Sequence, residues 1–344
     1  MSTIAGVFSE TLLRDLRVKA DELMFDDRIK QQFIPQVGVL DAIAAAQTAQ
    51  VTPKFMELKQ SNGGSKKYDI EVMWENACEV VAQECTTCAI DGPELSTNAQ
   101  IYGLEFCKEV PFAVNEYSMV DNEFDFQSLI AKGMLKADKE LAEALAVYAV
   151  SVLNANKGVN AYAGGPGVVS GADTYITAPF WGPNLMAYFM QVATMNRFTT
   201  PLLASGMNLY QDYFIYNKKV GDADGKGNAA LMGSFPIYFD PFNIDTVNTP
   251  NLFTYMLSMG SVALGNRTYN PSTVQESAAN WKRWTAPSKF VPGIAYDWFY
   301  KAECDNDMIK HQFKAKLTAD VLVNPAGCTA TNTGILTFIC GSAT

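Results

Sequence analysis

The sequence predicts an α+β fold in which long strands and one long helix follow one another instead of repeating as strand–helix–strand units. Residues 68–74 and 312–323 alternate apolar and polar side chains, which is the pattern of half-buried strands. Between them, residues 124–157 carry apolar side chains at the period of a helix. A chain of 344 residues can bury a sizeable core, or two smaller ones.

The first 50 residues are predicted to form an N-terminal arm. Residues 7–25 place Leu12 and Leu16 at helical spacing, with charged residues between them. Pro35 and Gly38 interrupt the pattern that follows. We therefore expect one amphipathic helix whose apolar face, including Leu12 and Leu16, contacts a neighbouring subunit.

Residues 51–115 are predicted to form an extended β-hairpin. Its strands are residues 68–74 and 101–110, and both show alternation of period two. The stretch between them has weak periodicity, and a long loop of this kind is unusual inside a compact domain. We therefore expect the hairpin to project onto a neighbouring subunit through four aromatic side chains: Tyr68, Trp74, Tyr102 and Phe106.

Residues 116–170 contain the strongest helical signal, at about 124–157. Asp125 suits the helix start and Gly158 its end. This predicted helix is longer than most helices of globular proteins.

The rest of the chain is predicted to form a mixed α/β block at 171–275 and C-terminal strands at 276–344. In the C-terminal part, residues 312–323 alternate between apolar and polar side chains. Residues 334–340 have apolar side chains at both odd and even positions. The second pattern is typical of a central strand that is covered on both faces.

The charge balance argues against nucleic-acid recognition. The chain has 26 Lys and Arg against 36 Asp and Glu, a net charge of -10. The first 50 residues are also acidic on balance, so no basic arm is present to neutralise phosphates. Only 18% of the residues are charged and 48% are apolar, which suits a subunit that covers part of its surface with other subunits.

The start of the chain lacks the basic and continuous apolar segments of a secretion signal, and the longest apolar run is too short to cross a bilayer. We therefore expect the protein to be made in the cytoplasm.

Few residues suit catalysis or metal binding. His311 is the only histidine, which removes most catalytic triads and sites with several histidines, and its place before a long strand predicts a surface or strand-end position. The cysteines of the hairpin region supply one close pair where a zinc site usually has two, so free thiols are the main expectation and a metal site the alternative: Cys78, Cys85, Cys88 and Cys107. No cofactor motif is found, and we expect no catalytic residue and no cofactor.

This order of elements resembles the major capsid proteins of tailed bacteriophages, which have the Hong Kong 97-type fold. The resemblance spans nearly the whole chain. It lies in the arm, the hairpin strands 68–74 and 101–110, the helix 124–157, the mixed block, and a last strand pair at 312–323 and 334–340. It implies a peripheral domain at 116–170 with a spine helix, an axial domain at 171–275, and a return to the peripheral domain at 276–344.

The resemblance also implies a function. Subunits of this kind self-assemble as hexamers and pentamers into an icosahedral or prolate head that encloses double-stranded DNA without reading its sequence. The implied partners are further copies of the chain together with portal, scaffolding or decoration proteins, and the implied location is the virion, assembled in the host bacterial cytoplasm. An acidic subunit fits this role because it repels packaged phosphate.

Two alternatives remain open on the residues alone. One is another structural protein, either an encapsulin-like shell or a phage tail component. The other, less favoured, is a cytoplasmic enzyme of unknown reaction, which would need a convergent polar cluster in a deep pocket.

Overall fold

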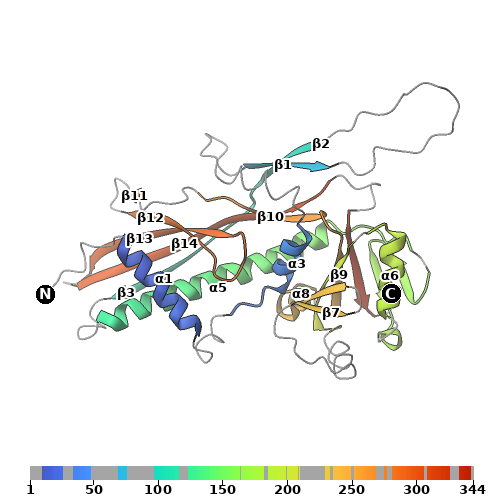
Figure 1. Ribbon diagram of the computed structural model, residues 1–344, viewed down its shortest axis with the longest axis horizontal. Helices are drawn as coiled ribbons and strands as arrows, with labels where there is room; N and C mark the ends of the chain where they lie inside the picture. Colours follow the sequence, from blue (N-terminus) through green and yellow to red (C-terminus); the bar gives the residue numbers. More distant parts are fainter. Residues whose placement is uncertain are drawn as a thin grey trace.

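One long helix and two β-sheets organise the computed structural model (Figure 1). Helix α5 (Glu123–Ala155) has 33 residues and is about 50 Å long at 1.5 Å per residue. In the part of the chain that the structure describes, no helix is both long and apolar enough to cross a membrane. The described residues are 10–25, 34–47, 69–75, 97–115, 123–162, 164–181, 185–198, 200–207, 209, 229–232, 235–248, 252–268, 275–276, 281–305, 308–325 and 333–341.

The six-stranded sheet is antiparallel and lies along the N-terminal part of α5. Its order is β10-β14-β13-β12-β11, with β3 also paired to β14. Its strands are β3 (Phe106–Asn115), β10 (Val262–Asn266), β11 (Gln275–Glu276), β12 (Lys282–Pro287), β13 (Ala295–Asp305) and β14 (Met308–Val323).

Alternation along β14 explains how this sheet packs. Phe313, Ala315 and Leu317 are buried in the same core as Ile130 of α5, whereas the intervening Lys314 and Lys316 are only half-buried. A strand with period two turns one face to the core and the other away from it. The alternation predicted for residues 312–323 is confirmed up to Leu317, whereas residues 318–322 are buried on both parities, and the strand begins at Met308, before the predicted start.

The seven-stranded sheet lies at the other end of the molecule, in the order β4-β5-β15-β9-β6-β8-β7. The pairs β5–β15 and β6–β8 are parallel and the other pairs are antiparallel. Its strands are β4 (Gly167–Ser170), β5 (Asp173–Ile176), β6 (Leu202–Ser205), β7 (Ala229–Met232), β8 (Phe235–Phe239), β9 (Leu252–Leu257) and β15 (Ile335–Cys340).

Helices cover both faces of the seven-stranded sheet. Helix α6 (Leu185–Met195) packs through Phe189 on one face, next to Phe338 of β15. The C-terminal part of α5, with α3 (Gly38–Ala46) and α8 (Pro241–Asn248), covers the other face. A short 3-10 helix, η3 (Ala178–Phe180), precedes α6. The prediction that residues 334–340 form a central strand covered on both faces is confirmed.

Two further elements lie outside the sheets. Helix α1 (Glu10–Phe25) forms where the arm helix was predicted, but it crosses α5 of its own subunit and packs Leu23 near Leu135. Strands β1 (Asp69–Glu75) and β2 (Thr97–Gly103) form an antiparallel pair that lies over the six-stranded sheet (Figure 1).

Three predicted features differ from the structure. The predicted strand 101–110 is interrupted after Gly103: β2 pairs with β1, whereas β3 joins β14. The strands at 312–323 and 334–340 do not pair, because β14 and β15 belong to different sheets. The division at 276 is also wrong, since β10 lies in the six-stranded sheet and β15 in the seven-stranded one. Periodicity shows which face of a strand is buried, but it does not identify the neighbouring strand.

Candidate assembly surfaces and the junction between the sheets

The β1–β2 pair is fixed to its own subunit by aromatic side chains. Trp74 is only 1% exposed and packs with Val72, Leu104 and Leu322. Its Nε1–H donates a hydrogen bond to the Tyr102 hydroxyl at 2.8 Å, and that hydroxyl donates to the Val323 carbonyl oxygen at 2.7 Å. Burial raises the pKa of Tyr102 to about 12, so the hydroxyl keeps the proton that it donates.

The predicted subunit-contact residues are therefore corrected in part. Leu16, Trp74 and Phe106 are 0%, 1% and 5% exposed, because each packs in the core of its own subunit. Phe106, for example, lies 5.2 Å from Tyr148 of α5, measured between ring centroids. Tyr102 is half-buried, and its hydroxyl forms the hydrogen bonds to Trp74 and Val323 described above. The two remaining candidates, the side chain of Leu12 and the whole of Tyr68, lie outside the described residues.

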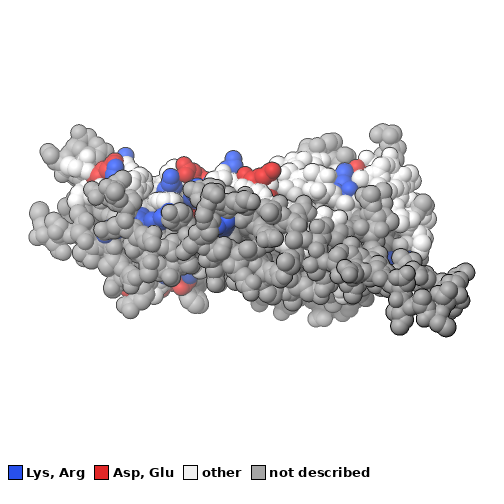
Figure 2. All heavy atoms as spheres, turned by 90° about the horizontal axis from the view of Figure 1, so that it is seen from above, with Lys and Arg blue, Asp and Glu red and all other residues white. Residues whose placement is uncertain are grey.

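A charge-poor surface covers much of the seven-stranded sheet. Between residues 158 and 209 the sequence has only two charged residues, Asp173 and Arg197. Figure 2 shows the contrast on one face, where coloured atoms gather over the left and centre and the described surface at the right is nearly all white. Six large apolar side chains of this stretch are well exposed: Val159, Val168, Phe180, Met190, Met195 and Met207. Apolar exposure without charge is typical of a surface that another protein covers.

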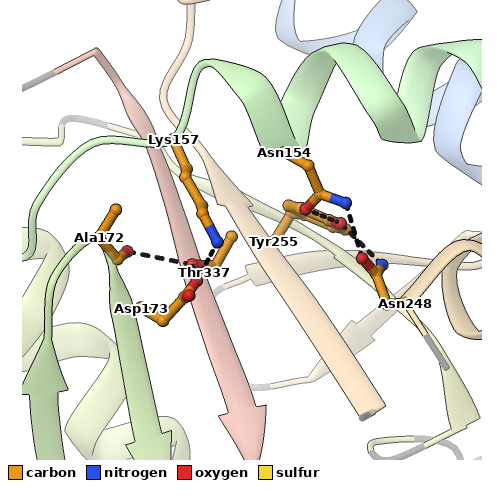
Figure 3. A network of polar contacts seen from close by, with 7 residues as sticks. All are labelled: Asn154, Lys157, Ala172, Asp173, Asn248, Tyr255 and Thr337. Atoms are coloured by element: carbon orange, nitrogen blue, oxygen red, sulfur yellow. Dashed lines mark hydrogen bonds and ion pairs between the residues drawn. The ribbon is translucent and has the colours of Figure 1, made fainter. Parts of the chain in front are cut away.

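Polar side chains join the end of α5 to the seven-stranded sheet (Figure 3). The Tyr255 hydroxyl of β9 donates to Asn154 Oδ1 at 2.7 Å and accepts from Asn248 Nδ2 at 2.9 Å. Asn154 Nδ2 then donates to Asn248 Oδ1 at 2.7 Å, which closes a ring of three side chains. Burial raises the pKa of Tyr255, so its hydroxyl remains protonated and continues to donate.

A second group of contacts lies beside this ring. Lys157 Nζ, just beyond α5, forms a 2.6 Å ion pair with Asp173 of β5. The Thr337 hydroxyl of β15 lies 2.7 Å from the same carboxylate and 3.2 Å from the Ala172 carbonyl oxygen. We call the six side chains of both groups the junction: Asn154, Lys157, Asp173, Asn248, Tyr255 and Thr337. None of these six side chains was predicted from the sequence, although Asn154 and Lys157 at the end of an apolar helix were a usable signal.

Other buried carboxylates serve structure. Asp138 of α5 accepts hydrogen bonds from the Ser288 hydroxyl and the Lys289 backbone N–H, both at 2.7 Å. Asp240 accepts from the backbone N–H groups of Val39 and Asn243 and so connects α3 with α8. Burial raises the pKa of both carboxyls. In both cases the carboxylate oxygens accept hydrogen bonds from groups that connect neighbouring elements of the fold.

His311 is not at the surface, one of the two positions predicted for it, and lies near the start of β14. It is 2% exposed within β14, and its Nδ1 lies 2.8 Å from the Tyr300 hydroxyl. The Phe126 ring packs on it edge to face, at 4.9 Å between centroids. Strand β14 begins at Met308, earlier than predicted, so His311 lies within the strand and its side chain faces the core.

The cysteines can be compared with the prediction only in part, because Cys78, Cys85 and Cys88 lie outside the described residues. Cys107 is an exposed free thiol on β3, and the Thr318 hydroxyl lies 3.9 Å from its sulfur. Among the residues that the structure describes, no group of three or more His, Cys, Asp or Glu could hold a metal ion.

The comparisons identify the fold. No protein-family model matches the sequence. No curated protein matches it. A chain of the cyanophage A-1(L) capsid matches with a TM-score of 0.50 and 11% identity over 89% of this chain and 93% of that one. Mycobacterium phage Che8 (TM-score 0.46, 13% identity, 85% and 92% covered) and the Ralstonia phage GP4 capsid (0.47, 9%, 84% and 86%) also match. On the cyanophage match, the chain has the fold of a phage capsid protein.

Proposed function

We propose that this chain is a major capsid protein of a tailed bacteriophage, with a Hong Kong 97-type fold, that assembles as hexamers and pentamers into a head around double-stranded DNA. The observation that carries the proposal is the fold that it shares with the cyanophage A-1(L) capsid chain over most of both chains. Because one fold can host different functions, the surfaces must also suit assembly.

The charge-poor surface supports self-association. Copies with a net charge of -10 repel one another, and the repulsion is least where charges are missing. Contacts between copies through residues 158–209 therefore bury apolar side chains without pairing or desolvating many charges. In this proposal the seven-stranded sheet is the axial domain and meets its copies around the capsomer axis, and the six-stranded sheet with α5 is the peripheral domain.

The acidic balance supports enclosure of DNA without binding. A negative subunit repels phosphate, so packaged DNA stays mobile inside the shell. The proposed location is the virion, after assembly in the bacterial cytoplasm, and the proposed partners are portal, scaffolding or decoration proteins.

Electron microscopy and light scattering of the purified chain test the assembly. We expect closed shells of one or a few diameters. A 37.7 kDa monomer at all concentrations and salt conditions would overturn the proposal. Particles that hold protein cargo instead of nuclease-protected DNA would indicate an encapsulin-like shell.

A matched pair of variants tests the contact surface. Met190→Lys with Met195→Lys places two charges on the charge-poor surface, at side chains that are 45% and 56% exposed, so the subunit should still fold. Lysine also lowers the net negative charge, so lost assembly cannot be assigned to greater repulsion. We expect no shells from this variant and normal shells from Val18→Lys, a 52% exposed position on α1. Normal shells from both variants would exclude α6 from the contact.

A further inference from the structure

We propose that the junction sets the angle between the two sheets and thereby the size of the shell. This inference rests on the proposed function for its second half, the shell size. Its first half, the angle within one subunit, concerns the chain alone.

Helix α5 is shared by the two parts of the molecule. Along its N-terminal half, Phe126 and Ile130 are buried with the inward side chains of the six-stranded sheet. At its C-terminal end, Asn154 and Lys157 reach α8, β9 and β5 (Figure 3). A 33-residue helix is a stiff rod, so its end carries the orientation of the first sheet to the second.

Apolar packing does not fix that orientation by itself. The end of α5 also shares an apolar core with the seven-stranded sheet, in which Val150 and Leu153 are buried together with Tyr255 and Leu257. Such packing stabilises the contact, but it is non-directional and tolerates small rotations of one element on another. Hydrogen bonds weaken steeply when their angles change, so a closed ring of three buried or half-buried side chains favours one orientation.

The chain also connects the two sheets at a turn, and this connection does not fix the angle between them by itself. The chain passes from β9 to β10 through residues 258–261, where Ser258 N–H donates to Gly334 O and Asn324 N–H donates to Ser261 O. The end of α5 and this turn by themselves leave a rotation about the line that joins them, and helix α3, which contacts β10 of one sheet and β6 and β8 of the other, is a further crossing. The Lys157–Asp173–Thr337 contacts bring β5 and β15 into the crossing at the end of α5 and restrain this rotation.

The angle within a subunit determines how a shell closes. In the proposed assembly each copy meets its neighbours through surfaces on both parts of the molecule. The rotation between successive copies then depends on the angle between those surfaces, and that rotation decides at how many copies the assembly closes. A subunit with a looser angle closes at several sizes.

Two variants loosen the junction while keeping the fold. Tyr255→Phe removes one hydroxyl and leaves the ring volume, and Lys157→Met removes the ion pair at a side chain that is 23% exposed. Lys139→Met is the matched control, because it removes the same charge and an ion pair with Glu143 within α5 itself. Spin labels on noncanonical residues at the exposed positions Lys108 of β3 and Ala187 of α6 report the distance between the two parts. Labelled chains are diluted into unlabelled chains, so that only the distance within one subunit is read.

We expect both junction variants to shift and broaden the distance distribution and to form particles of more varied diameter than the wild type, while Lys139→Met keeps the wild-type distances and diameters. A wild-type distance distribution in both junction variants would overturn the inference, even if their melting temperature falls. A changed distance with unchanged particle diameters would overturn its second half. If wild-type chains form no particles, the proposed function fails, and the distance measurement still decides whether the junction sets the angle.

Discussion

Trp74→Ala should release the β1–β2 pair from the six-stranded sheet without unfolding the rest of the subunit. The indole is 1% exposed and holds the pair through its packing and its hydrogen bond to Tyr102. A two-stranded pair is marginally stable by itself, so β1 and β2 depend on their packing against the six-stranded sheet. The substitution therefore weakens this packing and not the rest of the fold. Truncation of a buried Trp costs about 3–5 kcal/mol. At about 1.4 kcal/mol per tenfold change, amide protection in both strands should fall by about 100- to 4,000-fold.

Hydrogen exchange followed by mass spectrometry measures this change in residues 69–75 and 97–103. Tyr102→Phe is the graded control, because it removes two hydrogen bonds and keeps the ring, at a cost of about 1–2 kcal/mol. It should therefore fall between the wild type and Trp74→Ala. Protection in β1 and β2 that drops by less than about tenfold in Trp74→Ala would refute the assignment of Trp74 as the anchor.

Three further predictions concern the core. The pKa of Asp138 is raised in the folded state, so the folded chain binds the proton more tightly than the unfolded chain; this stability is present below the ordinary carboxyl pKa and is lost as pH rises through the raised one. Urea titrations should therefore show the wild type losing stability relative to Asp138→Asn as pH rises, and the opposite slope contradicts this. Gly38→Ala brings a Cβ to 2.2 Å from a carbonyl oxygen of β8 and should lower the free energy of unfolding by about 1–3 kcal/mol. Gly341→Ala, with nothing within 4 Å of the added Cβ, should lower it little, and equal denaturant midpoints of the two variants would disprove the clash. Tyr300→Phe removes the hydrogen bond to His311 and should lower the free energy of unfolding by about 1–2 kcal/mol, and an unchanged value would show that this bond is not stabilising.

Local patterns in the sequence determined the elements and their buried faces. The helical period of residues 124–157 predicted α5 almost to its ends, because a long amphipathic stripe has one way to bury itself. The alternation likewise predicted which side chains of β14 face the core over residues 312–317, whereas residues 318–322 are buried on both parities. The low charge content of residues 158–209 is also a property of the sequence, and the structure shows that part of this stretch is exposed.

Only the tertiary structure decided which elements meet. Trp74 and Phe106 were expected to contact a neighbouring subunit because their strands were predicted to project, yet both side chains are buried in their own subunit. Strands β14 and β15 follow each other in sequence but lie in different sheets. The junction brings together Asn154, Asp173 and side chains up to residue 337. Periodicity reports burial along one element, whereas such contacts depend on pairing between distant segments, and no repeating pattern in the sequence encodes that pairing.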